Sequence, residues 1–270
     1  MNKIDSHLID IGYMDTLASG DSVLHRLDPR AKLITTLVFI VTVVSFDKYT
    51  LSALIPFLIY PMFLVTAGAL PFTYLIKKVF LVAPFAMLIG VFNPLMDREI
   101  LLQIGALHIS GGWISFLSIM LRSVLTVSAA LTLIALTGFN SVCMAMEKLR
   151  IPKPFVIQLM FLYRYLFVLI DEAARMVRAR SLRSFNSNTM TVGLFVPLVG
   201  QLLFRALDRA QRIHLCMCCR GFDGHFHTIR PMKIGFNEIG FVVGWSSLFV
   251  LLRYQNLSVK FGEIITGFIQ

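Results

Sequence analysis

Long runs of apolar residues restrict this chain to folds that cross a membrane. Hydrophobic residues make up 57% of the 270 and charged residues only 15%, whereas a soluble domain carries about 25% charged residues. A helix needs about 20 residues to cross the hydrocarbon core, so the sequence predicts an all-α polytopic membrane protein with about five transmembrane helices, or six if the tail inserts. The predicted spans are Leu33–Phe46, Tyr49–Ile76, Val79–Met96, Trp113–Thr137 and Ile234–Leu252.

Lysines and arginines are unevenly distributed between the connections, and this predicts the orientation. The stretch 148–233 carries fourteen of them, and a predicted turn between the second and third spans carries Lys77 and Lys78. Because basic loops stay in the cytoplasm, we expect the N-terminus and the long insert to be cytoplasmic. The predicted division is 1–32, a cytoplasmic N-terminal segment; 33–137, four transmembrane helices; 138–233, a cytoplasmic domain; 234–253, the last transmembrane helix; and 254–270, a tail.

The insert 138–233 holds no clean span, but its apolar residues recur at helical spacing, which predicts amphipathic helices. We expect a short helix from Phe139 to the prolines at Pro152 and Pro154, and long helices over Phe155–Leu182 and Thr191–Arg220. The break between the long helices is predicted at Asn186-Ser187-Asn188-Thr189, and glycine just past a helix end, as at Gly221, is a typical stop.

Two arginines of the insert stand at predicted helix C-termini beside small residues. One sits in Ala179-Arg180-Ser181 and the other in Cys219-Arg220-Gly221. An arginine there interacts favourably with the helix dipole and can project into a partner's groove. Its planar fork suits bidentate pairing with a carboxylate. Arg175 is expected to form an exposed i, i+4 ion pair with Asp171.

Other polar groups carry weaker signals. Cys216-x-Cys218-Cys219 has no second Cys/His pair at ligand spacing, so no metal site is predicted, and His225-x-His227 is expected to be a solvated loop pair. Arg122 lies within a predicted span, where an arginine is a functional candidate by default. We favour a structural role for it, in which it pairs with a backbone carbonyl or a neighbouring helix, or extends towards the membrane interface.

The chain resembles the T component of energy-coupling-factor (ECF) transporters, in particular the CbiQ-type cobalt/nickel subfamily. Together the matching passages extend over almost the whole chain up to about residue 230. They are His25-Arg26-Leu27-Asp28-Pro29-Arg30-Ala31-Lys32; Phe92-Asn93-Pro94-Leu95; Asp171-Glu172-Ala173-Ala174-Arg175 leading to Ala179-Arg180-Ser181; and Arg209-Ala210 leading to Arg220-Gly221-Phe222.

The resemblance implies a role that composition does not show. Such a subunit is the non-catalytic transmembrane coupling part of an ABC-type importer in a prokaryotic inner or plasma membrane. Its long cytoplasmic helices cross and rest on two ATPase subunits, which bind ATP and Mg, and another part packs against a membrane substrate-binding (S or M) subunit. This chain itself is expected to bind no cofactor and no nucleic acid. Cobalt or nickel is implied by the subfamily alone.

Within that family, Ala-Arg-Gly-like motifs at the helix ends insert into grooves of the ATPases. Here Ser181 stands in place of glycine in the first motif and Cys219 in place of alanine in the second, and both arginines are present. The implied ATPase-coupling residues are Ala179, Arg180, Ser181, Cys219, Arg220 and Gly221, with Arg175, Arg178, Arg209 and Arg212 as supporting residues of the coupling helices.

Two other function classes are weaker alternatives. A stand-alone channel or secondary transporter would predict internal repeats and interrupted helices along a polar pathway, and the two halves show no repeat. An intramembrane enzyme needs a catalytic constellation at bilayer depth, but the predicted spans offer only Arg122 and Glu238 as ionisable groups, and no metalloprotease or acyl-transfer motif occurs.

Overall fold

The computed structural model describes residues 12–47, 50–96, 100–104, 107–183, 192–224 and 235–254, which are almost entirely helical. This confirms an all-α polytopic membrane protein. The chain forms two compact units. The first, which we call the bundle unit, comprises Thr16–Gly138 with Met232–Gln270, and the second, the insert unit, comprises Phe139–Pro231 with Met1–Asp15.

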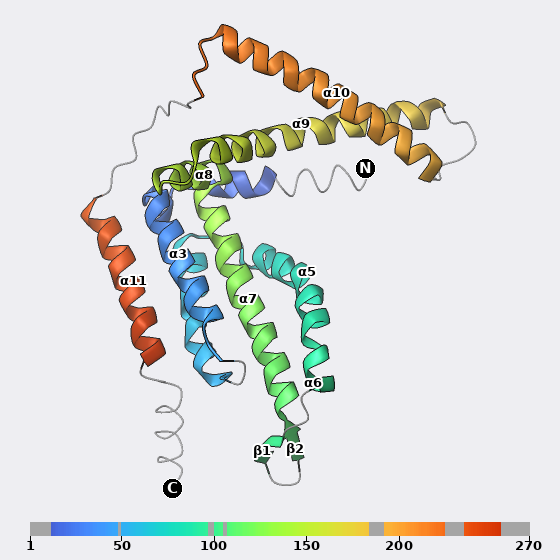
Figure 1. Ribbon diagram of the computed structural model, residues 1–270. Coiled ribbons are helices and arrows are strands. Elements are labelled where there is room, and N and C mark those ends of the chain that lie inside the picture. Colours follow the sequence, from blue (N-terminus) through green and yellow to red (C-terminus); the bar gives the residue numbers. More distant parts are fainter. Residues whose placement is uncertain are drawn as a thin grey trace. The chain divides into compact units, whose positions relative to one another are not determined.

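The bundle unit contains the predicted spans. α3 packs against both α7 and α11, and α5 packs against α7 (Figure 1). The elements are α2 (Val23–Arg26), α3 (Pro29–Val44), η1 (Ser52–Leu58), α4 (Ile59–Ala67), α5 (Phe72–Gly90), α6 (Phe92–Met96), α7 (Gly111–Thr137) and α11 (Phe236–Tyr254).

Four helices among the described residues are long and apolar enough to cross a membrane. Three belong to the bundle unit: Phe72–Pro94, Gly111–Thr137 and Phe236–Tyr254. α3 has 16 residues, and Ser52–Ala67 is a shorter apolar segment. The fourth is Lys153–Arg183 of the insert unit. The prediction that 138–233 holds no clean span is therefore wrong, because this helix has the length and the apolar composition of a membrane span.

The predicted turn at Lys77 and Lys78 is wrong. Both lysines lie inside α5, and the chain turns earlier, between Ala67 and Phe72. There Ala69 adopts a left-handed conformation with φ 51°, and Pro71 begins the next helix as its N-cap residue. This turn is itself apolar, so the hydrophobic run of the sequence continues through it unbroken.

A short hairpin precedes α7, and the sequence patterns do not predict it. β1 (Ile100–Ile104) pairs antiparallel with β2 (Leu107–Ser110), with Ile104 opposite Leu107. Two-stranded ribbons contribute little stability of their own. The hairpin is therefore a minor addition to a helical protein.

Aromatic side chains form the core of the bundle unit. Phe39 of α3, Phe57 of η1, Tyr60 of α4 and Phe249 of α11 are all buried. The ring centroids of Phe39 and Tyr60 lie 4.7 Å apart, and those of Phe39 and Phe249 lie 5.3 Å apart. Aromatic pairs at such distances stabilise beyond their buried area, so this cluster joins α3 and α11 to the consecutive segments η1 and α4.

Arg122 has the structural partner that we favoured. Its Nη2 donates a hydrogen bond to the backbone carbonyl of Asp47, which lies just beyond α3. Arg253 of α11 does the same at the carbonyl of Ser45, at 3.2 Å. The Ser45 carbonyl belongs to the C-cap of α3, whereas that of Asp47 lies in the following turn and also accepts hydrogen bonds from Thr50.

In the described part of 139–231 the insert unit forms three helices, close to those predicted. They are α8 (Phe139–Lys148), α9 (Lys153–Arg183) and α10 (Val192–Cys219), and α9 packs against both of the others. α8 ends where Arg150 takes a left-handed conformation (φ 69°) before Pro152. α10 crosses α9 (Figure 1). The predicted break at Asn186–Thr189 and the tail from 255 lie outside the described residues.

Candidate functional site

The first predicted coupling motif lies in the last turn of α9. Ala179 and Ser181 are exposed, and Ser181 Oγ donates to the carbonyl of Arg178 at 2.8 Å. Arg180 was expected to project beyond the helix tip, but α9 continues to Arg183. The Arg180 side chain is half-buried and lines a pocket with α10 residues, among them Pro197 and Phe204. This arginine therefore faces the neighbouring helix as well as the solvent.

The second motif forms a defined helix end. Cys219 is the last residue of α10, and Arg220 comes directly after it, fully on the surface. The amide of Gly221 bonds to the carbonyl of Cys218 and that of Phe222 to the carbonyl of Met217, each at 3.0 Å. With Gly221 at φ 76°, this is a Schellman motif. The predicted glycine stop is confirmed, and it holds Arg220 at the tip of α10.

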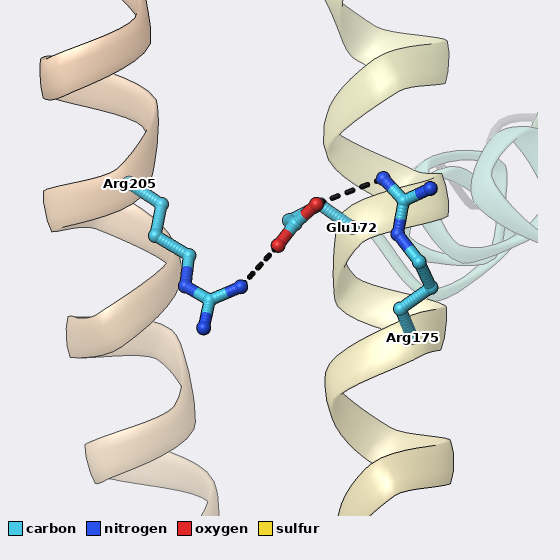
Figure 2. A network of polar contacts seen from close by, with 3 residues as sticks. All are labelled: Glu172, Arg175 and Arg205. Atoms are coloured by element: carbon cyan, nitrogen blue, oxygen red, sulfur yellow. Dashed lines mark hydrogen bonds and ion pairs between the residues drawn. The ribbon is translucent and has the colours of Figure 1, made fainter.

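A glutamate joins the two arginine-rich helices. Glu172 of α9 accepts a hydrogen bond from Arg175 Nη2 at 2.8 Å on one oxygen and from Arg205 Nη1 of α10 on the other (Figure 2). The Glu172 side chain is only 14% exposed, while both arginines remain more than half exposed. These bonds, from Arg175 first and then Arg205, lower the pKa of the Glu172 carboxyl below its usual value. The carboxylate therefore bridges the crossing of the helices.

This bridge replaces the ion pair that the sequence predicts. Arg175 pairs with Glu172 at i, i+3 and not with Asp171 at i, i+4, because Glu172 lies on the face of α9 that meets α10. Neither Glu172 nor Arg205 is among the site residues that the sequence indicates. The sequence shows two adjacent acidic residues, Asp171 and Glu172, ahead of the arginines. It does not show which of them meets Arg205, because that contact joins residues 33 positions apart.

Some of the predicted supporting arginines lie near this bridge and others do not. Arg209 is half-buried and Arg212 exposed, and both line a recess that also includes Glu172, Arg205 and Asp208. Arg178 is exposed on α9, away from that recess. The structure thus brings Arg175, Arg209 and Arg212 to the crossing and leaves Arg178 at the surface.

An apolar groove lies beside the crossing. Its volume is about 490 Å³, and its walls come from both long helices. Phe222 of the Schellman motif also lines it. Other lining residues include Phe161, Tyr165 and Leu169 from α9 and Ala210, Ile213 and Met217 from α10. A groove with charged helix ends nearby is suited to binding other polypeptides.

The cysteines near the tip of α10 form no metal cluster in the part of the chain that the structure describes. Cys218 Sγ lies 3.7 Å from His214 Nε2, but no group of three or more His, Cys, Asp or Glu residues there is placed to hold an ion. His225 and His227 lie outside the described residues.

Known proteins resemble the chain over most of its length. It is 28% identical to the energy-coupling factor transporter transmembrane protein EcfT of Bacillus subtilis (strain 168), over 76% of this chain and 82% of that protein. The EcfT of Heliobacterium modesticaldum is 26% identical over 86% of this chain and 92% of that protein. An uncharacterised protein of Methanocaldococcus jannaschii, MJ1571, is 25% identical over 82% and 78%.

A family model matches in the same region. The CbiQ model, described as cobalt transport protein, covers residues 20–230, which include the bundle helices up to α7 and the two arginine-ended helices. A match over so much of the chain shows the family. The protein belongs to the CbiQ family and is a transmembrane (T) component of the energy-coupling-factor transporters.

Proposed function

We propose that this chain couples two ABC-type ATPase subunits to a membrane substrate-binding subunit, and is not catalytic itself. Movement of the ATPases on binding ATP and Mg would displace Arg180 and Arg220, and α9 and α10 would carry that displacement to the substrate-binding subunit. The observation that carries the proposal is the crossing of two long helices, each ending in an arginine motif and joined to the other at Glu172.

The charge distribution supports a cytoplasmic position for the N-terminus and the insert unit. Four arginines lie in the last three turns of α9, and four more lie between Arg205 and Arg220. Lysine and arginine are retained on the cytoplasmic side of a membrane. In this orientation both arginine tips face the compartment that holds ATP.

The substrate is proposed from the family description alone. The matching model is described as cobalt transport protein, and we propose cobalt or nickel as the transported ion. The EcfT relatives carry no substrate in their names, as expected if specificity resides in the substrate-binding subunit. Uptake of radioactive cobalt and nickel by cells with and without the intact chain tests this point directly.

Purification of the chain from its native membrane tests the coupling role. We expect two ABC-type ATPase subunits and a small membrane protein to co-purify with it. The double variant Arg180→Glu, Arg220→Glu should lose the ATPases or the transport they drive. In the proposed complex each arginine pairs with a charge of an ATPase subunit, and removing one partner of a charge pair buried in an interface costs about 2–5 kcal/mol of binding free energy.

A matched control separates tip position from net charge. Arg164→Glu with Lys148→Glu makes the same change of charge at exposed sites of the same unit that are not at the tips of α9 and α10, and we expect ATPase binding and transport to persist. Absence of any ATPase from the parent complex, or normal transport by the tip variant, would refute the coupling role.

A further inference from the structure

A buried lysine holds the last turn of α7. Lys32, in the first turn of α3, is only 3% exposed. Its Nζ donates a hydrogen bond of 3.1 Å to the backbone carbonyl of Leu136, 104 positions away. Leu136 is the second-last residue of α7, and carbonyls in the final turn of a helix have no partner within the helix. The lysine therefore caps α7 from another element.

The electrostatics at this point favour a cation. The C-terminal end of a helix carries partial negative charge, so the ammonium of Lys32 is placed where it stabilises α7. Asp28, one turn earlier, is also buried, and its Oδ1 accepts a hydrogen bond of 2.8 Å from the amide of Arg30 as the N-cap of α3. Burial of a charge is unfavourable unless it has such partners. Packing alone would be served better by an apolar side chain.

The capped turn is where the chain leaves the bundle unit. α7 ends at Thr137, and Gly138 has a φ of 75° with its amide bonded to the carbonyl of Ile134 at 2.8 Å. α8, the first helix of the insert unit, begins at the next residue, Phe139. Lys32 thus ties α3 to the turn that immediately precedes the passage from one unit to the other.

We propose that Lys32 is a positioning residue, which anchors the C-terminal end of α7 so that motion of the insert helices is transmitted to the bundle. This inference rests on the proposed coupling function. Without the anchor, a pull on α8 would unwind the last turn of α7 and would not move the helix as a whole. The anchor also gives a role to Lys32 within Asp28-Pro29-Arg30-Ala31-Lys32, a passage that the arginine motifs of the insert unit do not involve.

Hydrogen exchange in the whole purified complex, reconstituted in lipid nanodiscs, tests the anchor. In Lys32→Met we expect amides of the last turn of α7 to exchange at least about fivefold faster, the factor expected from loss of one hydrogen bond. The conservative variant Lys32→Arg should restore slow exchange. Thr35→Val is the matched control, because Thr35 is equally buried in α3 but bonds to its own helix, at the carbonyl of Ala31. It should leave α7 unchanged.

Substrate uptake per ATP hydrolysed is a second measurement, and it distinguishes a positioning role of Lys32 from a role in folding alone. Lys32→Met should keep ATP hydrolysis by the complex but lose most substrate uptake per ATP hydrolysed, and Lys32→Arg should recover it. Unchanged exchange at the end of α7, or faster exchange with normal uptake per ATP, overturns the proposal. If Lys32→Met does not accumulate, Lys32→Leu also removes the donor with an apolar side chain, and the same two outcomes apply. Exchange does not depend on the ATPases, so failure of the coupling function itself would be seen separately, as a parent complex that lacks ATPase subunits.

Discussion

The bundle unit and the insert unit bury their apolar side chains to very different extents. In the bundle unit Phe39 is 0% exposed and sits within an aromatic cluster from four helical segments. In the insert unit no residue of α10, which is described along its full length, is buried, and Phe204 is 70% exposed. The bundle therefore has a buried aromatic core, although it also exposes apolar side chains such as Phe80 (76%), whereas α10 contributes no buried side chain.

This difference indicates where each unit obtains its stability. A helix with an exposed apolar face needs another surface against it. Within the insert unit, α10 is held by the Glu172 bridge and by packing against α9. In the proposed complex the remaining apolar surface of α10 belongs to partner subunits. The insert unit is then expected to gain order on assembly, and the bundle to keep the order it has.

Truncation of one phenylalanine in each unit should give the largest difference in the free energy of unfolding between the two units. Phe39→Ala should destabilise the protein by about 3–5 kcal/mol, because it leaves a cavity in the aromatic core. Phe204→Ala should change stability by less than about 0.5 kcal/mol, as expected for a surface substitution. Thermal unfolding in detergent, monitored by circular dichroism, measures both. Equal shifts of the midpoint would contradict the contrast.

Addition of one methyl group in each unit should give a smaller difference in the free energy of unfolding. A Cβ at Gly68 of the bundle would overlap Leu136 Cδ2 and lie 2.7 Å from the carbonyl oxygen of Leu64. Gly68→Ala should therefore destabilise by about 1–3 kcal/mol through overpacking. A Cβ at Gly221 meets nothing within 4 Å, so Gly221→Ala carries only the left-handed backbone penalty of about 1 kcal/mol.

The two glycine variants are compared by denaturant titration of the purified chain. A cost at Gly221 larger than that at Gly68 would show that the insert unit is more tightly packed than the exposed fractions of its side chains indicate. Added ATPase subunits should raise the cost at Gly221 and leave that at Gly68 unchanged, because Gly221 belongs to a proposed docking motif and Gly68 does not.

The smallest expected effect concerns the Glu172 bridge and pH. The pKa of Glu172 is lowered in the folded protein, so the stabilisation is present above the ordinary value of 4.5 and is lost as pH falls through the lowered value. Distances between spin labels at exposed positions 153 and 201, in a background with the cysteines replaced, should broaden at the acidic end. Glu172→Gln should show broad distances at every pH. Identical pH dependence in both proteins would exclude the bridge as the cause.

Features with local causes can be predicted from sequence. Both ends of α9 and α10 lie within two residues of the predicted positions. Pro152 directly precedes α9, Pro154 lies in its first turn, and Gly221 comes just after α10. The motif at Arg220 is visible for the same reason, since Gly221 is part of it. Prolines and glycines act on the backbone directly, and their effect needs no knowledge of neighbouring elements.

Features with tertiary causes cannot be predicted in this way. The turn between α4 and α5 is apolar throughout, so hydropathy places the break too late, at Lys77 and Lys78. Glu172 differs from Asp171 only in which side of α9 it occupies relative to α10. In the sequence Lys32 is one of several charges that indicate orientation, and its burial becomes visible only with the end of α7 beside it.

The Schellman motif at the end of α10 makes the place of Arg220 independent of the chain beyond Phe222. All of its hydrogen bonds join residues between Met217 and Phe222. Insertions or deletions downstream of Gly224 can then vary in length among relatives without moving the arginine. We therefore expect the connection to α11 to vary more among relatives than the position of Arg220 at the end of α10.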